Sequence, residues 1–216
     1  MILPFQSFAT RRDRMVRTQL SSRGIHDARV LSAMAAVPRH EFIPESLRDD
    51  AYEDHPLPIG EDQTISQPYI VAAMLQHLAL QPSDRVLEIG TGSGYATALL
   101  SVLTAEVYTI ERFPSLSESA DATLARLGYS NVRCKVADGR EGWPGYAPYN
   151  AILVSAATAE APPALFNQLA EAGRMIIPIG DPTSQELQLI RKLNNKRVLT
   201  LLEGCRFVPL LQGKAD

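Results

Sequence analysis

The sequence contains very little cysteine and no pattern of metal ligands. Its two cysteines, Cys134 and Cys205, lie far apart and form no CxxC motif. This arrangement predicts neither a disulfide framework nor a zinc site, and we interpret both side chains as small buried hydrophobic groups. The four histidines show no HxH or HxxxH spacing, so no bound metal is expected.

Long apolar runs and an excess of positive charge are also missing. No apolar stretch reaches the roughly 18 residues of a membrane helix, and residues 1–7 do not have the pattern of a signal peptide. The net charge of -3 argues against a nucleic-acid-binding protein, which usually has a basic surface. We therefore expect a cytoplasmic protein that binds neither membranes nor nucleic acid. A monomer is a separate expectation, which does not follow from these features. A local basic cluster has the spacing of the solvated face of an amphipathic helix: Arg11, Arg12, Arg14 and Arg17.

From Pro68 onward, short apolar runs alternate with helical patterns. Such alternation predicts a parallel sheet with helices on both faces. After Gly180 the helical patterns stop, and residues 187–192 and 198–202 predict an antiparallel pair joined at Asn194 and Asn195. The expected fold class is α/β, with a doubly wound, mostly parallel sheet. Strands are predicted at 85–89, 106–110, 131–136, 151–154 and 174–179, and helices at 68–78, 95–103, 115–127 and 162–169.

The first third of the chain predicts a helical extension followed by a loop. A first helix ends at Gly24, and a second is capped by Asp27 and ended by Pro38. Residues 49–67 show no sustained period and are predicted to form a loop that acts as a lid or binding segment. We expect one domain over residues 1–216. Its parts are the extension and lid at 1–67, the α/β core at 68–180, and the antiparallel strands at 181–216.

A glycine-rich turn follows the first predicted parallel strand, in the sequence VLEIGTGSGY at residues 86–95. Glycines let the backbone turn tightly and approach a ligand. The spacing is GxGxG, and Tyr95 stands where the GxGxxG turn of a dinucleotide site requires a small residue. Glu88 would repel a diphosphate but would hold the positive amino acid end of a sulfonium cofactor, directly or through water. The turn residues expected to contact such a cofactor are Gly90, Thr91, Gly92 and Ser93.

Acidic residues end the next two predicted strands. Glu111 is placed to accept the hydroxyls of a ribose, and Asp138, before Gly139, to accept the exocyclic amine of adenine. Alone, either acid would read as a surface or turn residue. Together with Glu88 and the glycine turn, they predict a nucleoside-containing cofactor.

Several segments resemble the protein-L-isoaspartate O-methyltransferases over residues 10–213. They are VPRHEF at 37–42, AYED at 51–54, PLPIG at 56–60, QTISQPY at 63–69, the glycine turn, and RFVPL at 206–210. The resemblance implies a Rossmann-like class I methyltransferase that uses S-adenosylmethionine. Its implied substrate is the free α-carboxylate of L-isoaspartyl residues in damaged proteins, whose repair this methylation starts.

The resemblance also implies roles for individual residues. Ser66 is implied as the active-site residue, with substrate contacts at Pro58, Ile59, Ile65 and Ser66. Gln67 and Tyr69 are implied to lie beside the cofactor, with Glu111, Asp138 and Gly139 as further contacts. This chain departs from the usual family residue at four positions: Asp62, Ala137, Ser155 and Cys205. Asp62 would add negative charge near an anionic substrate.

The implied chemistry needs no general base, because a carboxylate with a pKa near 4 is already ionised at neutral pH. We therefore interpret Ser66 as a hydrogen-bond donor that orients the acceptor; the alternative is an N-cap for the helix that begins near Pro68. Three other functions are alternatives to this one. A small-molecule methyltransferase would lack the TISQP segment and lid. A nicotinamide oxidoreductase would require GxGxxG, and a non-catalytic module would have lost Glu88, Glu111 or Ser66.

Overall fold

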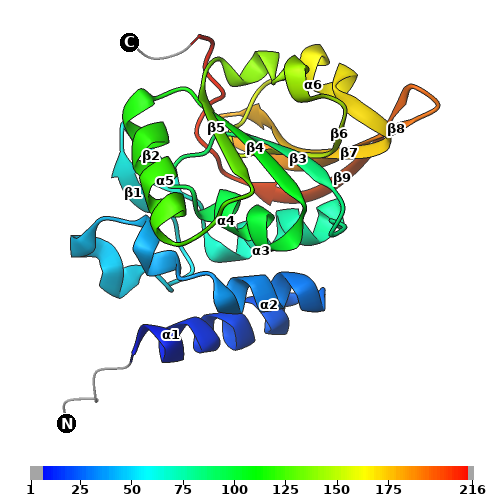
Figure 1. The fold of residues 1–216 in the computed structure, drawn as a ribbon. Coiled ribbons are helices and arrows are strands. Elements are labelled where there is room, and N and C mark those ends of the chain that lie inside the picture. Colours follow the sequence, from blue (N-terminus) through cyan, green and yellow to red (C-terminus); the bar gives the residue numbers. More distant parts are fainter. Residues whose placement is uncertain (1–6, 214–216) are drawn as a thin grey trace.

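The computed structural model describes residues 7–213, and its centre is a seven-stranded sheet. The strand order is β5-β4-β3-β6-β7-β8-β9, with β3 to β7 parallel and β8 and β9 antiparallel to their neighbours (Figure 1). The expected α/β class is confirmed. The strands are β3 (Arg85–Ile89), β4 (Glu106–Glu111), β5 (Val132–Val136), β6 (Tyr149–Val154), β7 (Leu169–Asp181), β8 (Ser184–Leu193) and β9 (Lys196–Cys205).

Helices cover both faces of this sheet, but unequally. One face carries α3 (Pro68–Leu78), α4 (Tyr95–Leu103) and α5 (Pro114–Arg126). The other face carries the short α6 (Pro163–Asn167) and two 3-10 turns, Gly139–Glu141 and Pro144–Tyr146. Along β3, Val86 joins the first core and Leu87 joins the second. Because both faces are buried, the parallel strands appear in the sequence as continuous apolar runs.

The N-terminal helices form a further layer outside α3 and α4 (Figure 1). They are α1 (Phe8–Met15), which continues as a π-helix at Val16–Leu20, and α2 (Ala28–Ala36). Asp27 caps α2 as predicted, accepting the N–H groups of Arg29 and Val30. Of the basic cluster, Arg14 and Arg17 are exposed and Arg11 and Arg12 are half-buried. Arg14 pairs with Glu53 at 3.1 Å.

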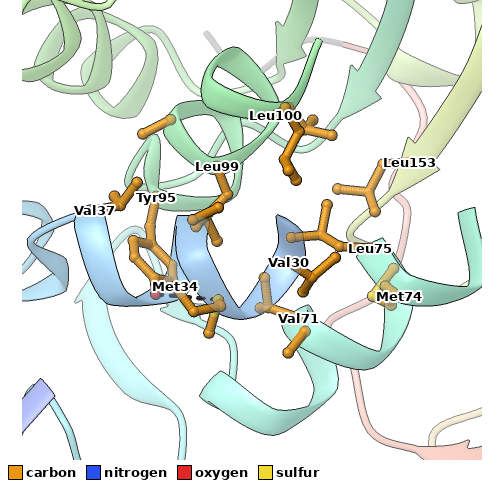
Figure 2. Close-up of a cluster of buried hydrophobic side chains, with 14 of the residues drawn as sticks. Val30, Met34, Val37, Val71, Met74, Leu75, Tyr95, Leu99, Leu100 and Leu153 are labelled. Carbon is orange, nitrogen blue, oxygen red and sulfur yellow. Dashed lines mark hydrogen bonds between the residues drawn. The ribbon is translucent and has the colours of Figure 1, made fainter. Parts of the chain in front are cut away.

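This outer layer shares its core with the sheet. In Figure 2, Val30 and Met34 of α2 lie among Val71 and Leu75 of α3 and Leu99 of α4. Each of these side chains is at most 5% exposed, so truncating one to alanine would cost about 2–5 kcal/mol. The helical extension is therefore packed as part of the main hydrophobic core.

The prediction of an unstructured loop over residues 49–67 is wrong. The segment contains an antiparallel hairpin of β1 (Leu57–Gly60) and β2 (Gln63–Ile65). Its turn consists of Glu61 and Asp62, with φ angles of 51° and 54°. Strands of three and four residues are too short to show an alternating pattern, and Pro58 argues against a strand. The turn contains no glycine pair that would mark a hairpin.

The prediction of a helix over residues 162–169 is too long at its C-terminal end. The helix α6 ends at Asn167, and β7 already begins at Leu169. Leu169 pairs with Tyr149 of β6, and Ala172, with a φ of 60°, precedes a shift in register. The apolar residues at 165, 166 and 169 fit a helical period, but pairing with β6 determines the conformation at Leu169.

The hairpin turn gives a prediction about Asp62. A non-glycine residue is strained at positive φ, so Asp62→Gly should raise the free energy of unfolding, measured in urea, by up to about 1 kcal/mol. The control is Glu118→Gly in α5, where the same loss of an acidic side chain occurs in an ordinary helix. It should lower stability by about 1 kcal/mol. Equal losses for the two variants would show that strain at Asp62 is absent.

Candidate active site

A cavity opens at the carboxyl edge of the parallel strands. Its volume, open mouth included, is about 970 Å³. Residues from the ends of β3, β4 and β6 line it, together with the chain after β9. In a doubly wound fold, this edge is where ligands bind. Eight of the predicted site residues lie here: Ile65, Ser66, Gly90, Thr91, Gly92, Ser93, Glu111 and Gly139.

The glycine turn takes its shape from backbone conformations that favour glycine. Gly90 has a φ of 90°, and its N–H donates to the carbonyl of Ile110 at 2.8 Å. Gly94 has a φ of 87° and packs so closely on α5 that a Cβ there would lie 3.2 Å from Ala120. The turn is therefore pressed between the end of β4 and α5, with its backbone exposed to the cavity.

Glu111 connects the glycine turn to the end of β4. Its carboxylate accepts the N–H of Gly92 at 2.8 Å, of Arg112 at 2.7 Å and of Phe113 at 3.0 Å. The side chain is 5% exposed and lines the cavity. Since each carboxylate oxygen accepts more than one hydrogen bond, Glu111 can also accept a ligand hydroxyl.

Glu88 does not line the cavity; it is fully buried beneath the glycine turn. Its Oε2 accepts hydrogen bonds from Thr97 at 2.5 Å and Thr109 at 2.7 Å, while Oε1 has no partner among the described residues. Burial raises the pKa of Glu88 to about 7. The hydroxyls of Thr109 and Thr91 lie 2.6 Å apart, and Thr91 lines the cavity. Glu88 thus reaches the cavity wall through two threonines.

Asp138 also lies outside the cavity lining. Its Oδ1 caps the following 3-10 turn by accepting the N–H of Arg140, and its Oδ2 accepts the N–H of Gly213 at 2.7 Å. The neighbouring Gly139 does line the cavity, and a Cβ there would meet Ile89 Cγ2 at 2.4 Å. The glycine therefore allows the chain to pass close to the end of β3.

Two predicted substrate residues lie elsewhere on the hairpin. Pro58 is exposed and lines neither this cavity nor its neighbour. Ile59 lines a third, separate cavity, to which Gly92 and Ser93 also contribute. Asp62 is exposed in the hairpin turn, outside both cavities, so its charge is not part of either wall.

A second cavity adjoins the first. Gln67 and Tyr69 line it rather than the cavity of the glycine turn. Gln67 Nε2 donates to Asp54 Oδ2 at 2.8 Å, and the Arg23 guanidinium lies 3.8 Å from the centre of the Tyr69 ring. Five residues line both cavities and so form their shared wall: Thr64, Ser66, Ser155, Phe207 and Val208.

Ser66 does not cap the helix that follows it, so the capping alternative is wrong. The N-cap of α3 is Gln67, and no side chain of the described residues caps this helix end. Within residues 7–213, no hydrogen bond is recorded for the Ser66 hydroxyl, which leaves it available at the shared wall.

The residues that the sequence did not single out as part of the site are mainly those of the tail. Phe207 to Leu211 line the cavity beside the glycine turn. The VPRHEF segment contributes Arg39, which is fully buried and donates to the carbonyl of Ser66 at 2.8 Å. In the sequence, the signal for this contact is an arginine between two apolar residues, Val37 and Phe42. The structure buries both of them.

Residues 7–213 contain no group of three or more His, Cys, Asp or Glu side chains arranged to hold a metal ion. No helix in that range is long and apolar enough to cross a membrane.

The fold and the glycine-turn cavity define a Rossmann-like nucleoside-binding enzyme. The family model described as Protein-L-isoaspartate(D-aspartate) O-methyltransferase (PCMT) matches residues 10–215. The chain is 55% identical over 205 residues to Protein-L-isoaspartate O-methyltransferase 1 of Syntrophobacter fumaroxidans, covering 95% of this chain and 96% of that protein. The chain belongs to the PCMT family of class I S-adenosylmethionine-dependent methyltransferases, which confirms the resemblance seen in the sequence.

Two solved structures are also similar. A protein-L-isoaspartate O-methyltransferase aligns with a TM-score of 0.82 and 32% identity, covering 92% of this chain and 65% of that chain. A Plasmodium falciparum beta-aspartate methyltransferase (PCMT), in complex with S-adenosyl-L-homocysteine, aligns with a TM-score of 0.81 and 28% identity. That match covers 93% of this chain and 98% of the other.

The burial of Glu88 predicts a pH-dependent stability. Its pKa is raised from 4.5 to about 7 in the folded chain, so the folded state holds the proton more tightly than the unfolded state. Stability should therefore fall as pH rises from about 5 to 8, by up to about 3 kcal/mol from this group. Glu88→Gln should remove this part of the dependence. Parallel curves of unfolding free energy against pH for the two proteins would contradict the burial of an ionisable Glu88.

Proposed function

We propose that the two adjoining cavities hold the two reactants of a protein-L-isoaspartate O-methyltransferase, and that Ser66 aligns them. The cavity at the glycine turn takes the S-adenosylmethionine that this family uses. The second takes the isoaspartyl residue of a damaged protein. The observation that carries the proposal is the place of Ser66 on the wall common to both cavities.

The residues of the glycine-turn cavity fit such a cofactor. Gly90 and Gly92 expose backbone without side chains, and Glu111 offers an acceptor for ribose hydroxyls at the end of β4. Apolar side chains suited to a nucleobase lie nearby, including Ile110, Phe113 and Leu210. Asp138 is occupied by backbone N–H groups and is proposed to shape this wall rather than to contact adenine through its carboxylate.

The N-terminus of α3 supports binding of a carboxylate in the second cavity. Pro68 has no N–H, and no side chain among residues 7–213 caps the helix, so the N–H groups of Tyr69 and Ile70 have no acceptor in that range. Both residues line the second cavity. A helix N-terminus favours an anion there, and the Ser66 hydroxyl adds a third donor.

The proposed methyl transfer needs no further catalytic group from the protein. The bound cofactor supplies an electrophilic methyl group, and the acceptor carboxylate is already ionised at neutral pH. The protein therefore has to orient the carboxylate and exclude water rather than remove a proton. Good alignment is worth about 7–11 kcal/mol in ideal cases. We also propose that the protein acts as a monomer, because residues of a single chain line both cavities.

Substitution of Ser66 tests its role. Ser66→Ala should lower kcat roughly 10- to 100-fold, because the carboxylate loses an orienting donor. The affinity for S-adenosylhomocysteine, measured by calorimetry, should stay within about twofold of the original, since the rest of the glycine-turn cavity is intact. Ser130→Ala, an exposed serine outside both cavities, is the control. Equal loss of rate and cofactor affinity in Ser66→Ala would contradict an orienting role.

Paired peptides test the acceptor. With methyl-labelled S-adenosylmethionine, an isoaspartyl peptide should acquire base-labile label, and the same peptide with ordinary aspartate should not. Equal labelling of both peptides, or labelling of neither, would contradict the isoaspartyl assignment and favour a small-molecule acceptor.

A further inference from the structure

Arg39 is a fully buried cation that binds backbone rather than a carboxylate. Its Nε donates to the carbonyl of Ala51 at 2.8 Å, and its Nη2 donates to the carbonyl of Ser66 at 2.8 Å. The guanidinium also lies 4.9 Å from the centre of the Tyr95 ring. No ion pair is recorded for it within residues 7–213.

The three residues that Arg39 contacts lie in three different parts of the structure. Ser66 lies on the wall between the cavities, and Tyr95 is the first residue of α4, directly after the glycine turn. Ala51 follows the 3-10 turn Glu45–Asp50 of the N-terminal part. A single guanidinium thus connects the acceptor-binding segment, the end of the cofactor-binding turn and the N-terminal extension.

The environment makes this cation costly. Burial lowers the pKa of Arg39 to about 10, and its Nη1 has no partner among the described residues. A desolvated cation without a carboxylate partner opposes folding, so its hydrogen bonds to carbonyl groups are the interactions that offset the cost. Because guanidinium is planar, it fixes the directions of both carbonyl groups at once.

We infer that Arg39 is a positioning residue for methyl transfer. By holding the Ser66 carbonyl, it fixes the peptide plane between Ser66 and Gln67. That plane anchors the backbone that carries the Ser66 side chain and leads into α3. The contact with Tyr95 ties this plane to the glycine turn, so acceptor and cofactor share one frame. The inference rests on the proposed role of Ser66.

Arg39→Lys is the sharpest test. Lysine keeps the positive charge, but its single ammonium cannot reproduce the two directed bonds. At constant pH, kcat for an isoaspartyl peptide should fall roughly 10-fold or more, because small misplacements of reacting groups slow transfer. The dissociation constant of S-adenosylhomocysteine should change less than about twofold. Rates are expressed per S-adenosylhomocysteine-binding site, so that loss of folded protein does not count as loss of kcat.

Arg174→Lys is the matched control. Arg174 also binds backbone carbonyls, those of Leu78, Ala79 and Asn150, and it pairs with Asp84 at 2.6 Å. It lines neither cavity. This variant should lower the melting temperature while leaving kcat unchanged at a temperature well below melting. A kcat for Arg39→Lys that equals that of Arg174→Lys would overturn the positioning role.

A double variant separates this inference from the role of Ser66. If Arg39 acts through Ser66, Arg39→Lys should slow the Ser66→Ala protein much less than it slows the original chain. Full multiplication of the two effects would overturn the inference while leaving the role of Ser66 intact. A Ser66→Ala variant with unchanged kcat would instead contradict the proposed role of Ser66, whatever the effect of Arg39→Lys.

Discussion

The site depends on how the end of β4 holds the turn that follows β3. The carbonyl of Ile110 accepts the N–H of Gly90, and Glu111 accepts the N–H of Gly92. These bonds fix the glycine turn, and the parallel register places its open side at the carboxyl edge of the sheet. A cofactor bound there rests on backbone that the sheet has already ordered, so little conformational entropy is lost on binding.

In the proposed function, the N-terminal extension brings the acceptor to this cofactor site. Packing of α2 against α3 and α4 buries it in the main core, as Figure 2 shows. The segment at Ser66 then enters α3 directly, and the chain after β9 closes the shared wall with Phe207 and Val208. Segments from both ends of the sequence thus complete a site whose base is the α/β sheet.

Much of this arrangement was predictable from local sequence. The alternation of apolar runs and helical patterns predicts β3 to β6 and α3 to α5 because their burial repeats regularly. The glycines and Glu111 are recognisable by their spacing. The contact between Arg39 and Ser66 spans 27 residues and has no local pattern. Burial of Glu88 beneath the turn, and Asp138 acting as a cap, likewise depend on packing and hydrogen bonds made in three dimensions.

The proposed function places Ser66 between the methyl donor and the acceptor carboxylate. The most direct measurement is a crystal structure of this chain with S-adenosylhomocysteine and an isoaspartyl peptide. The nucleoside should lie against Glu111 and the glycine turn, with the α-carboxylate within hydrogen-bond distance of the Ser66 hydroxyl and the α3 N-terminus. A carboxylate bound away from Ser66, or a nucleoside outside the glycine-turn cavity, would contradict it.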